Sequence, residues 1–121
     1  MCKGTNGGIA MGDNQKVIQS FAKDVQKVFG KALYQVILYG SYARGDYRDN
    51  SDIDIMILTS LSEQEIKDIE NTIYDIAFEY ELSCEVMISV NIKNTEHFNY
   101  WLGALPYYDN VRKEGVVLAE G

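Results

Sequence analysis

The chain has 121 residues, of which 46% are hydrophobic, and its formal net charge is -7 at pH 7. This size fits one small domain with a thin core. The acidic balance argues against strong nucleic-acid binding, which needs clustered lysine and arginine. The sequence starts without the apolar run of a signal peptide and holds no stretch of membrane-spanning length, so we expect a cytoplasmic protein without membrane contact.

A glycine-rich start precedes the first helical pattern. Residues 1–13 have no apolar periodicity and are expected to be disordered, which leaves residues 14–121 as the folded domain. After residue 14, apolar side chains recur on one helical face at Val17, Phe21, Val25 and Val28. Gly30 follows this pattern directly and is well placed to end the helix.

Two apolar strands flank a polar loop in the next part of the chain. Residues 33–39 and 52–59 are rich in β-branched and aromatic side chains, which is typical of buried strands. The pair Gly40-Ser41 predicts a tight exit from the first strand. A short helical turn over residues 42–44 and a charged loop over residues 45–51 complete the connection.

The second half of the chain continues the alternation of helices and strands. Ser62 and Glu65 form the pattern of a capping box at the start of a long amphipathic helix. The remaining predicted elements are a strand over 83–90, a helix from Thr95 to about Leu102, a helix over 107–113 after the helix-breaking Pro106, and a short strand or extended tail over 116–118. We therefore predict an α+β fold with a short mixed sheet.

Strand alternation assigns the side chains to the two sheet faces. In the second strand one face receives Ile53, Ile55 and Ile57, and the other receives Asp52, Asp54, Met56 and Leu58. In the third predicted strand the same alternation places Glu85, Met87 and Ser89 on the aspartate face. We expect helices on the isoleucine face and an open catalytic face opposite. The exposed Met56, Leu58 and Met87 would then form a surface for a homodimer or a second protein.

Three carboxylates on one sheet face require a cation. Asp52, Asp54 and Glu85 would repel one another unless a positive ion lay between them. Strand neighbours at positions i and i+2 lie roughly 6–7 Å apart along the backbone, so the two aspartates can converge on one ion or bracket two. Magnesium takes carboxylate oxygens together with water and substrate phosphates. The pattern therefore predicts Asp52, Asp54 and Glu85 as metal ligands, and two Mg²⁺ ions could serve an in-line displacement at phosphorus.

The turn after the first strand has the features of a phosphate site. Gly40 leaves room for phosphate oxygens against the backbone, and Ser41 offers a hydroxyl and a backbone N–H at the opening of a helical turn. Arg44 follows three residues later and can reach the same phosphates with its fork of donors. Together with the carboxylates, these residues indicate a nucleoside triphosphate bound with magnesium.

The sequence Leu38-Tyr39-Gly40-Ser41, followed by a spacer and Asp52-Ile53-Asp54-Ile55, resembles the motif of the polymerase-β-type nucleotidyltransferase superfamily. The stretches Gly-Ser-Tyr-Ala-Arg-Gly and Ser-Asp-Ile-Asp-Ile are similar to those of the minimal nucleotidyltransferases, or MNT group, as is the segment from Arg112 to Leu118. Members of this group are small domains that are often paired with a HEPN partner. The resemblance implies a small nucleotidyltransferase fold with helices on one face of the sheet.

The resemblance also implies a role for each motif residue. Gly40 and Ser41 would hold the triphosphate, Arg44 would contact phosphate, and Asp52 and Asp54 would bind both magnesium ions. Glu85 would be the third catalytic carboxylate and would help to deprotonate the acceptor. The implied activity is transfer of a nucleoside monophosphate, AMP from ATP, to an acceptor hydroxyl. Within the MNT group that acceptor is plausibly a tyrosine of a HEPN toxin, which would make this chain an antitoxin.

Two alternatives stay open at the level of the sequence. An antibiotic nucleotidyltransferase that acts on an aminoglycoside or lincosamide would share the motif, but such enzymes generally carry an extra domain for the drug. A non-catalytic module that only binds its partner would share the fold. The presence of Ser41, Arg44, Asp52 and Asp54 together favours the enzyme.

Overall fold

The computed structural model describes residues 10–46, 48 and 51–120. Its centre is a four-stranded sheet in the order β3-β2-β1-β4, formed by β1 (Leu33–Tyr39), β2 (Ile53–Thr59), β3 (Ile88–Asn94) and β4 (Val116–Glu120). Strand β1 pairs antiparallel with both β2 and β4, whereas β2 and β3 run parallel. The sheet is therefore mixed, which confirms the predicted α+β class. In the described part of the chain, no helix is long and apolar enough to cross a bilayer.

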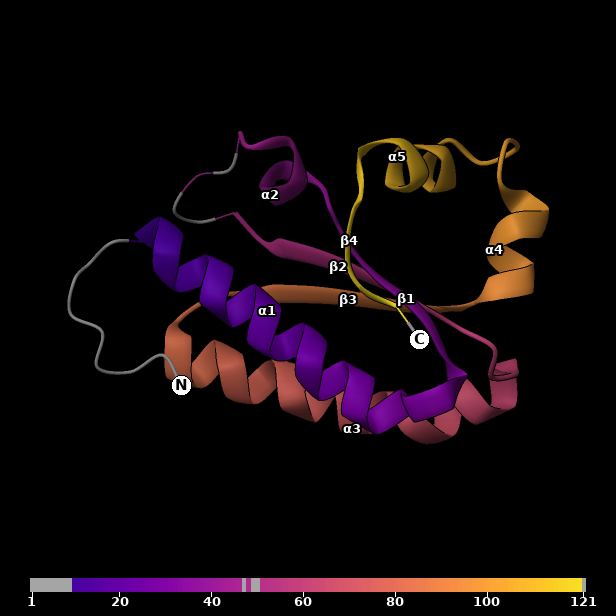
Figure 1. The fold of residues 1–121 in the computed structure, drawn as a ribbon, viewed down its shortest axis with the longest axis horizontal. Coiled ribbons are helices and arrows are strands. Elements are labelled where there is room, and N and C mark those ends of the chain that lie inside the picture. Colours follow the sequence, from indigo (N-terminus) through magenta and orange to yellow (C-terminus); the bar gives the residue numbers. More distant parts are fainter. Residues whose placement is uncertain (1–9, 47, 49–50, 121) are drawn as a thin grey trace.

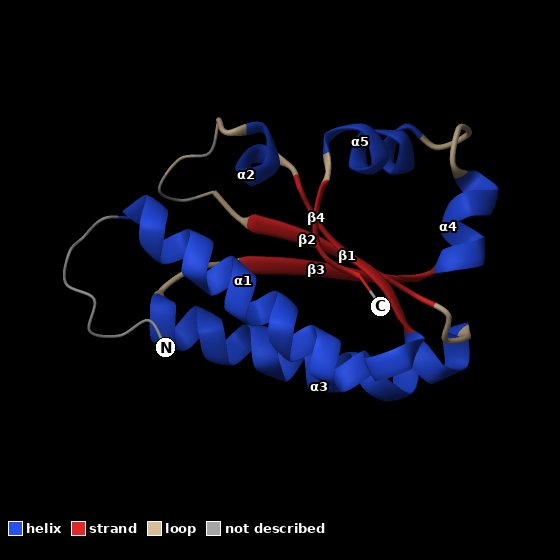
Figure 2. Ribbon diagram, in the orientation of Figure 1, coloured by secondary structure: helices blue, strands red, loops and turns tan. Residues whose placement is uncertain are grey.

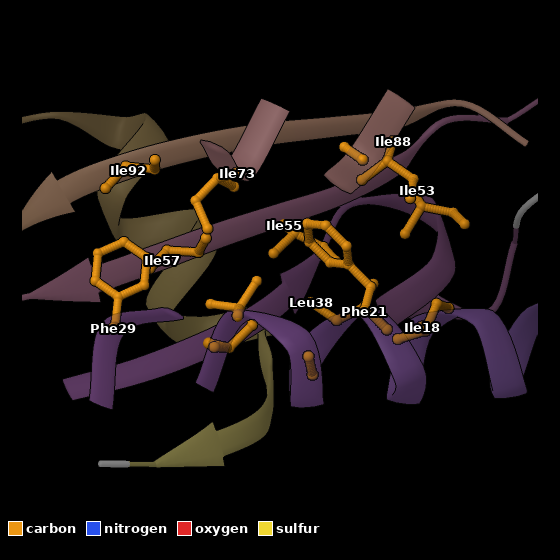
Figure 3. Packing of buried hydrophobic residues seen from close by; sticks show 14 of the residues in the cluster. Ile18, Phe21, Phe29, Leu38, Ile53, Ile55, Ile57, Ile73, Ile88 and Ile92 are labelled. Atoms are coloured by element: carbon orange, nitrogen blue, oxygen red, sulfur yellow. The ribbon is translucent and has the colours of Figure 1, made fainter. Parts of the chain in front are cut away.

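Helices α1 (Ala10–Phe29) and α3 (Glu63–Cys84) cover one face of the sheet (Figures 1 and 2). The main core forms between them and the sheet, and Figure 3 shows Ile53, Ile55 and Ile57 packed together with Phe21 and Ile73. Burial of each such side chain stabilises the fold by about 1.5–3 kcal/mol. The three isoleucines of β2 thus face the helices, as their alternation predicts.

The opposite face is partly covered by two short helices, α4 (Thr95–Trp101) and α5 (Pro106–Glu114). A second cluster forms beneath them from Ile37, Met56, Leu58, Phe98, Tyr108 and Val111. The prediction that Met56 and Leu58 are exposed is wrong, because both are buried in this cluster. Met87 does remain exposed, at 57%. Helices α4 and α5 therefore leave part of this face open, and Asp54 is only partly buried there.

The N-terminal boundary differs from the prediction in one respect. Helix α1 begins at Ala10, four residues before the predicted start of the domain, and residues 1–9 lie outside the described part. A short 3₁₀ helix at Gly30–Ala32 then links α1 to β1. Gly30 has φ 55°, a left-handed backbone that glycine adopts at little cost, and the predicted helix stop at this residue is confirmed.

The predicted third strand over 83–90 is wrong, because helix α3 continues to Cys84 and β3 starts only at Ile88. Three hydrogen bonds hold the last turns of α3 in place. The Tyr80 hydroxyl lies 2.6 Å from Ser20 Oγ and donates to Asp24 Oδ2 at 2.7 Å, both on α1. Glu81 Oε2 accepts a hydrogen bond of 2.9 Å from the backbone N–H of Ile88. The capping box of Ser62 and Glu65 at the other end of α3 is present as predicted.

Candidate active site

The turn after β1 is packed directly against a carboxylate of β2. Gly40 has φ 78° and ψ -154°, a backbone region that is essentially restricted to glycine. A Cβ placed on Gly40 would collide with Asp54 Oδ2 and would lie 3.2 Å from Asp54 Cγ. Residue 40 must therefore be glycine for two independent reasons, its conformation and the space that it leaves for Asp54.

Helix α2 (Ser41–Arg44) follows this glycine and is anchored to α1. The Tyr42 side chain is buried, and its hydroxyl accepts a hydrogen bond of 2.9 Å from Asn14 Nδ2. The carbonyl of Gly40 accepts hydrogen bonds from the N–H groups of Ala43 and Arg44. These contacts fix the position of Ser41, which is half-buried at the start of α2.

Asp52 and Asp54 lie at the start of β2 but in different environments. Asp52 is exposed just before the strand, and Asp54 is partly buried within it. In the sheet register Asp54 lies between Tyr39 of β1 and Ser89 of β3. Burial raises the pKa of the Asp54 carboxyl, the negative charge of Asp52 raises it further, and the positive charge of Arg44 lowers it. The ionised pair is thus destabilised by desolvation and mutual repulsion, which a bound cation would relieve.

The donor set of this pair fits a divalent cation. Carboxylate oxygens are preferred ligands of Mg²⁺, which usually keeps waters or substrate phosphates at its other positions. Asp52 and Asp54 would hold such an ion, and the backbone of the Gly40 turn lies directly against the Asp54 carboxylate. A site completed by a triphosphate needs no further protein ligand on chemical grounds.

Glu85 does not join this pair. It caps the end of α3 in a left-handed conformation, φ 57° and ψ 45°, and its backbone N–H bonds to Glu81 O at 3.0 Å. Its placement on the third strand is therefore wrong, and with it the alternation argument that nominated it. Among the described residues, no three His, Cys, Asp or Glu side chains form a group that could hold a metal ion.

The strand β3 presents polar but uncharged neighbours to the aspartates. Ser89 lies opposite Asp54, so the predicted face of Ser89 is correct although the predicted strand began too early. Asn91 Nδ2 donates a hydrogen bond of 3.0 Å to the Tyr39 hydroxyl, and this contact crosses β2 beside Asp54. Sequence reasoning missed Tyr39 and Asn91. Extending the period-2 pattern past residue 90 would have placed Asn91 on this face.

Arg44 stands near the site but is engaged with other carboxylates. Its guanidinium forms ion pairs with Asp46 Oδ2 at 3.3 Å and with Glu114 Oε1 at 3.2 Å. The hydrogen bond to Asp46, followed by the one to Glu114, raises the pKa of Arg44. Both pairs are solvent-exposed and therefore weak. The role of Arg44 as a phosphate contact stays a prediction.

Comparison with known proteins identifies the class to which this fold and site belong. Residues 18–114 match the model of the nucleotidyltransferase domain family. The match spans most of the chain and includes the turn at Gly40 and both aspartates. The chain therefore belongs to the nucleotidyltransferase domain family, which confirms the relationship predicted from its motif.

Relatives and solved structures agree with this assignment. MJ0604 and MJ0141 of Methanocaldococcus jannaschii are both provisionally named protein adenylyltransferases. MJ0604 is 31% identical, and the match covers 88% of this chain and 98% of MJ0604. MJ0141 is 39% identical, and the match covers 61% of this chain and 73% of MJ0141. A crystal structure of a provisionally named nucleotidyltransferase from Sulfolobus solfataricus has a TM-score of 0.62 at 21% identity, covering 98% of this chain and 92% of that one. A toxin–antitoxin structure with AMP-PNP has a TM-score of 0.53 at 18% identity, covering 85% and 73%. These structures share the fold.

Proposed function

We propose that this protein transfers AMP from ATP to a hydroxyl group of a partner protein, in a reaction that depends on magnesium. The observation that carries the proposal is the packing of the Gly40 turn against Asp54, with Asp52 beside it. Membership of the nucleotidyltransferase family supports the reaction type. The names of the relatives MJ0604 and MJ0141 support an adenylyl group as the transferred group and a protein as the acceptor.

Each residue of the site has a defined task in this proposal. Asp52 and Asp54 would hold Mg²⁺, which when bound would neutralise charge on the phosphates and polarise them for attack. The backbone at Gly40 and the hydroxyl and N–H of Ser41 would hold the triphosphate, and Arg44 would exchange its exposed carboxylate partners for a phosphate. The presence of a second ion, which Asp52 and Asp54 would also bind, stays a prediction.

The reaction balances without any further reagent. The acceptor hydroxyl oxygen forms a bond to the α-phosphorus of ATP, and the bond from that phosphorus to the bridging oxygen of pyrophosphate breaks. The hydroxyl proton leaves to water or to a carboxylate, and pyrophosphate departs with its electron pair. No described residue of this chain occupies the position of a third carboxylate, so we propose that Asp54, partly buried and with a raised pKa, is the protein group nearest to the reacting atoms.

The proposed acceptor rests on the group that the motif resembles. We propose a tyrosine of a HEPN-type toxin, with this chain acting as the antitoxin. The toxin–antitoxin structure with AMP-PNP supports a paired partner. So does a structure of a mutant of the toxin–antitoxin MntA-HpeT, which has a TM-score of 0.52 at 16% identity and covers 85% of this chain and 73% of that one. One of them carries glutamates in place of two aspartates that are two positions apart, which is the spacing of Asp52 and Asp54.

Incubation with α-labelled ATP, Mg²⁺ and the product of the neighbouring gene tests this function. Label should appear on the partner protein and should be lost with either Asp52→Asn or Asp54→Asn. Glu85→Gln provides a matched control, since it removes an exposed carboxylate from outside the pair. Label that survives both aspartate changes would refute the assigned site. Transfer to an aminoglycoside but to no protein would replace the proposed acceptor with a drug.

A further inference from the structure

The outer surface of α3 carries an apolar stripe that stays exposed in the described part of the chain. Tyr74, Phe78 and Leu82 follow one another at intervals of four residues, so they lie in a line on one side of the helix. Their exposed fractions are 43%, 56% and 67%. A row of exposed large apolar side chains on an otherwise charged helix is typical of an interaction surface.

A groove runs beside this stripe. It has a volume of about 410 Å³ and lies between Tyr74 and Phe78 of α3 and Ile88 and Val90 of β3. Strand β3 is an edge of the sheet, because its only neighbour in the strand order of the described residues is β2. The stripe and the groove together can therefore accept the apolar side chains of an extended or helical segment from another molecule.

The charged side chains of α3 along the stripe are negative, and Lys67 lies two turns before Tyr74. From residue 68 to residue 85 the chain contains no lysine or arginine, and its acidic residues are Asp68, Glu70, Asp75, Glu79, Glu81 and Glu85. Helical spacing places Glu81 on one side of the stripe and Asp75 and Glu79 on the other, and Glu70 continues its line one turn before Tyr74. The Tyr74 pKa is raised by burial and then by the negative charge of Glu70. A second copy of this chain would bring the same carboxylates into contact, so charge favours a basic segment of a different protein.

The stripe and the aspartates lie at the same end of the sheet. Helix α3 ends where β2 and β3 begin, at the same end of the molecule (Figure 1). Between α3 and β3 lies the exposed Met87, whose carbonyl accepts a hydrogen bond of 2.8 Å from the N–H of Ile53. Ile53 lies between Asp52 and Asp54 in the sequence. A segment bound along the stripe would thus reach the end of the sheet at which Asp52 and Asp54 lie, and would have to pass around that end to reach them, because the aspartates are on the opposite face of the sheet from α3.

We propose that the stripe of Tyr74, Phe78 and Leu82 is the docking surface for the acceptor protein, and that this protein binds through a basic amphipathic segment. The inference rests on the proposed function for the identity of the partner as acceptor. Binding of the segment does not depend on the transfer reaction, because docking needs the apolar stripe and the flanking carboxylates but neither nucleotide nor metal. The two parts can therefore fail independently.

The test uses a short synthetic helical peptide with leucines along one side and lysines on its flanks, labelled with a dye. Its binding to the full chain is measured by fluorescence anisotropy at low and high salt. We expect specific binding that weakens by about tenfold in a Phe78→Ser, Leu82→Ser double variant, because the substitutions remove apolar side chains at the centre of the proposed interface. Both side chains are exposed, so the variant should fold. Tyr100→Ser on α4, where the side chain is 76% exposed, is the matched control and should bind like wild type.

A peptide of the same composition in shuffled order, without an apolar side, should bind at least tenfold more weakly. Equal binding of both peptides, or equal binding by the double variant, would overturn the proposal. Self-association in light scattering that the double variant abolishes would also overturn it, because the occupant would then be a second copy. Labelling of the neighbouring gene product that the double variant leaves intact refutes docking but not the transfer reaction. Peptide docking without labelling of any protein refutes the transfer reaction but not docking.

Discussion

Gly40 and Asp54 are in such close contact that a single carbon added to Gly40 would overlap the Asp54 carboxylate. This contact joins the end of β1 to the second residue of β2, and it places the backbone of the turn beside the carboxylates of the candidate site. The predicted phosphate-binding and metal-binding parts of the sequence are therefore one structural unit.

Replacement of Gly40 by alanine should abolish transfer, because the new methyl group must displace Asp54. The variant should also lose about 1–3 kcal/mol of stability from its strained backbone. Denaturant unfolding measures the stability, and the labelling assay measures the activity. Gly45→Ala is the matched control, since Gly45 also has a positive φ, 87°, but nothing lies within 4 Å of its missing Cβ. If Gly45→Ala lost activity as completely as Gly40→Ala, strain and not the contact with Asp54 would be the cause.

Asp54 should make the stability of the protein depend on pH. Its folded pKa is raised above the ordinary value of 3.8, so the folded state binds the proton more tightly than the unfolded state does. Its favourable contribution is complete below pH 3.8 and is lost as the pH rises through the folded pKa. The difference in unfolding free energy between wild type and Asp54→Asn should therefore change in this window, with the variant gaining relative to wild type as the pH rises.

Magnesium should reverse that loss in the wild type at neutral pH and should have little effect on Asp54→Asn. Thermal unfolding with and without the ion measures this difference. A wild-type melting temperature that does not respond to Mg²⁺, in the presence or absence of a non-hydrolysable ATP analogue, would argue against a metal held by this pair.

Ser89→Asp should strengthen divalent-cation binding. Ser89 lies opposite Asp54 in the parallel register, so the new carboxylate would stand beside the existing pair. We expect about tenfold tighter binding of Mn²⁺, which is the size of the affinity change that residues around a metal site typically cause. Electron paramagnetic resonance of the free ion measures this affinity. Glu85→Gln should leave the affinity unchanged, because Glu85 caps α3. A marked loss of affinity in Glu85→Gln would instead restore Glu85 as a ligand. The same titration counts the bound ions.

Tyr80→Phe should destabilise the protein by about 1–3 kcal/mol, because it removes a hydroxyl that contacts Ser20 and donates to the charged Asp24 across two helices. Tyr74→Phe on the same helix is the control and should change stability by less than about 0.5 kcal/mol. Urea unfolding of both variants provides the measurement. Similar losses in the two variants would show that the α1–α3 hydrogen bonds add nothing.

Local signals in the sequence were sufficient for β1, β2 and the start of α3. The bounds of β1 were predicted as Leu33–Tyr39, because a run of apolar strand formers ends there at a glycine. The capping box fixed the start of α3 through contacts only three residues apart. The contact of Gly40 with Asp54 was not predictable in detail, but the motif indicated that both residues serve one site.

Long-range contacts explain what the sequence could not predict. The end of α3 is held by Tyr80, whose partners on α1 are distant in sequence, so local β-propensity after Ser83 predicts a strand where the helix continues to Cys84. Burial of Met56 and Leu58 depends on how α4 and α5 fold back over the sheet. Alternation correctly predicts that Met56 and Leu58 face away from the isoleucines of β2, but it does not predict which distant helices cover that face.

The most direct test of the account is the mass of the partner protein after incubation with ATP and Mg²⁺. For the wild-type chain, we predict that the neighbouring gene product gains the mass of an AMP group on a tyrosine, and that Asp54→Asn abolishes this gain. An unchanged partner mass with the wild type, under conditions in which the chain binds ATP and Mg²⁺, would contradict the proposed transfer. So would an equal gain with Asp54→Asn.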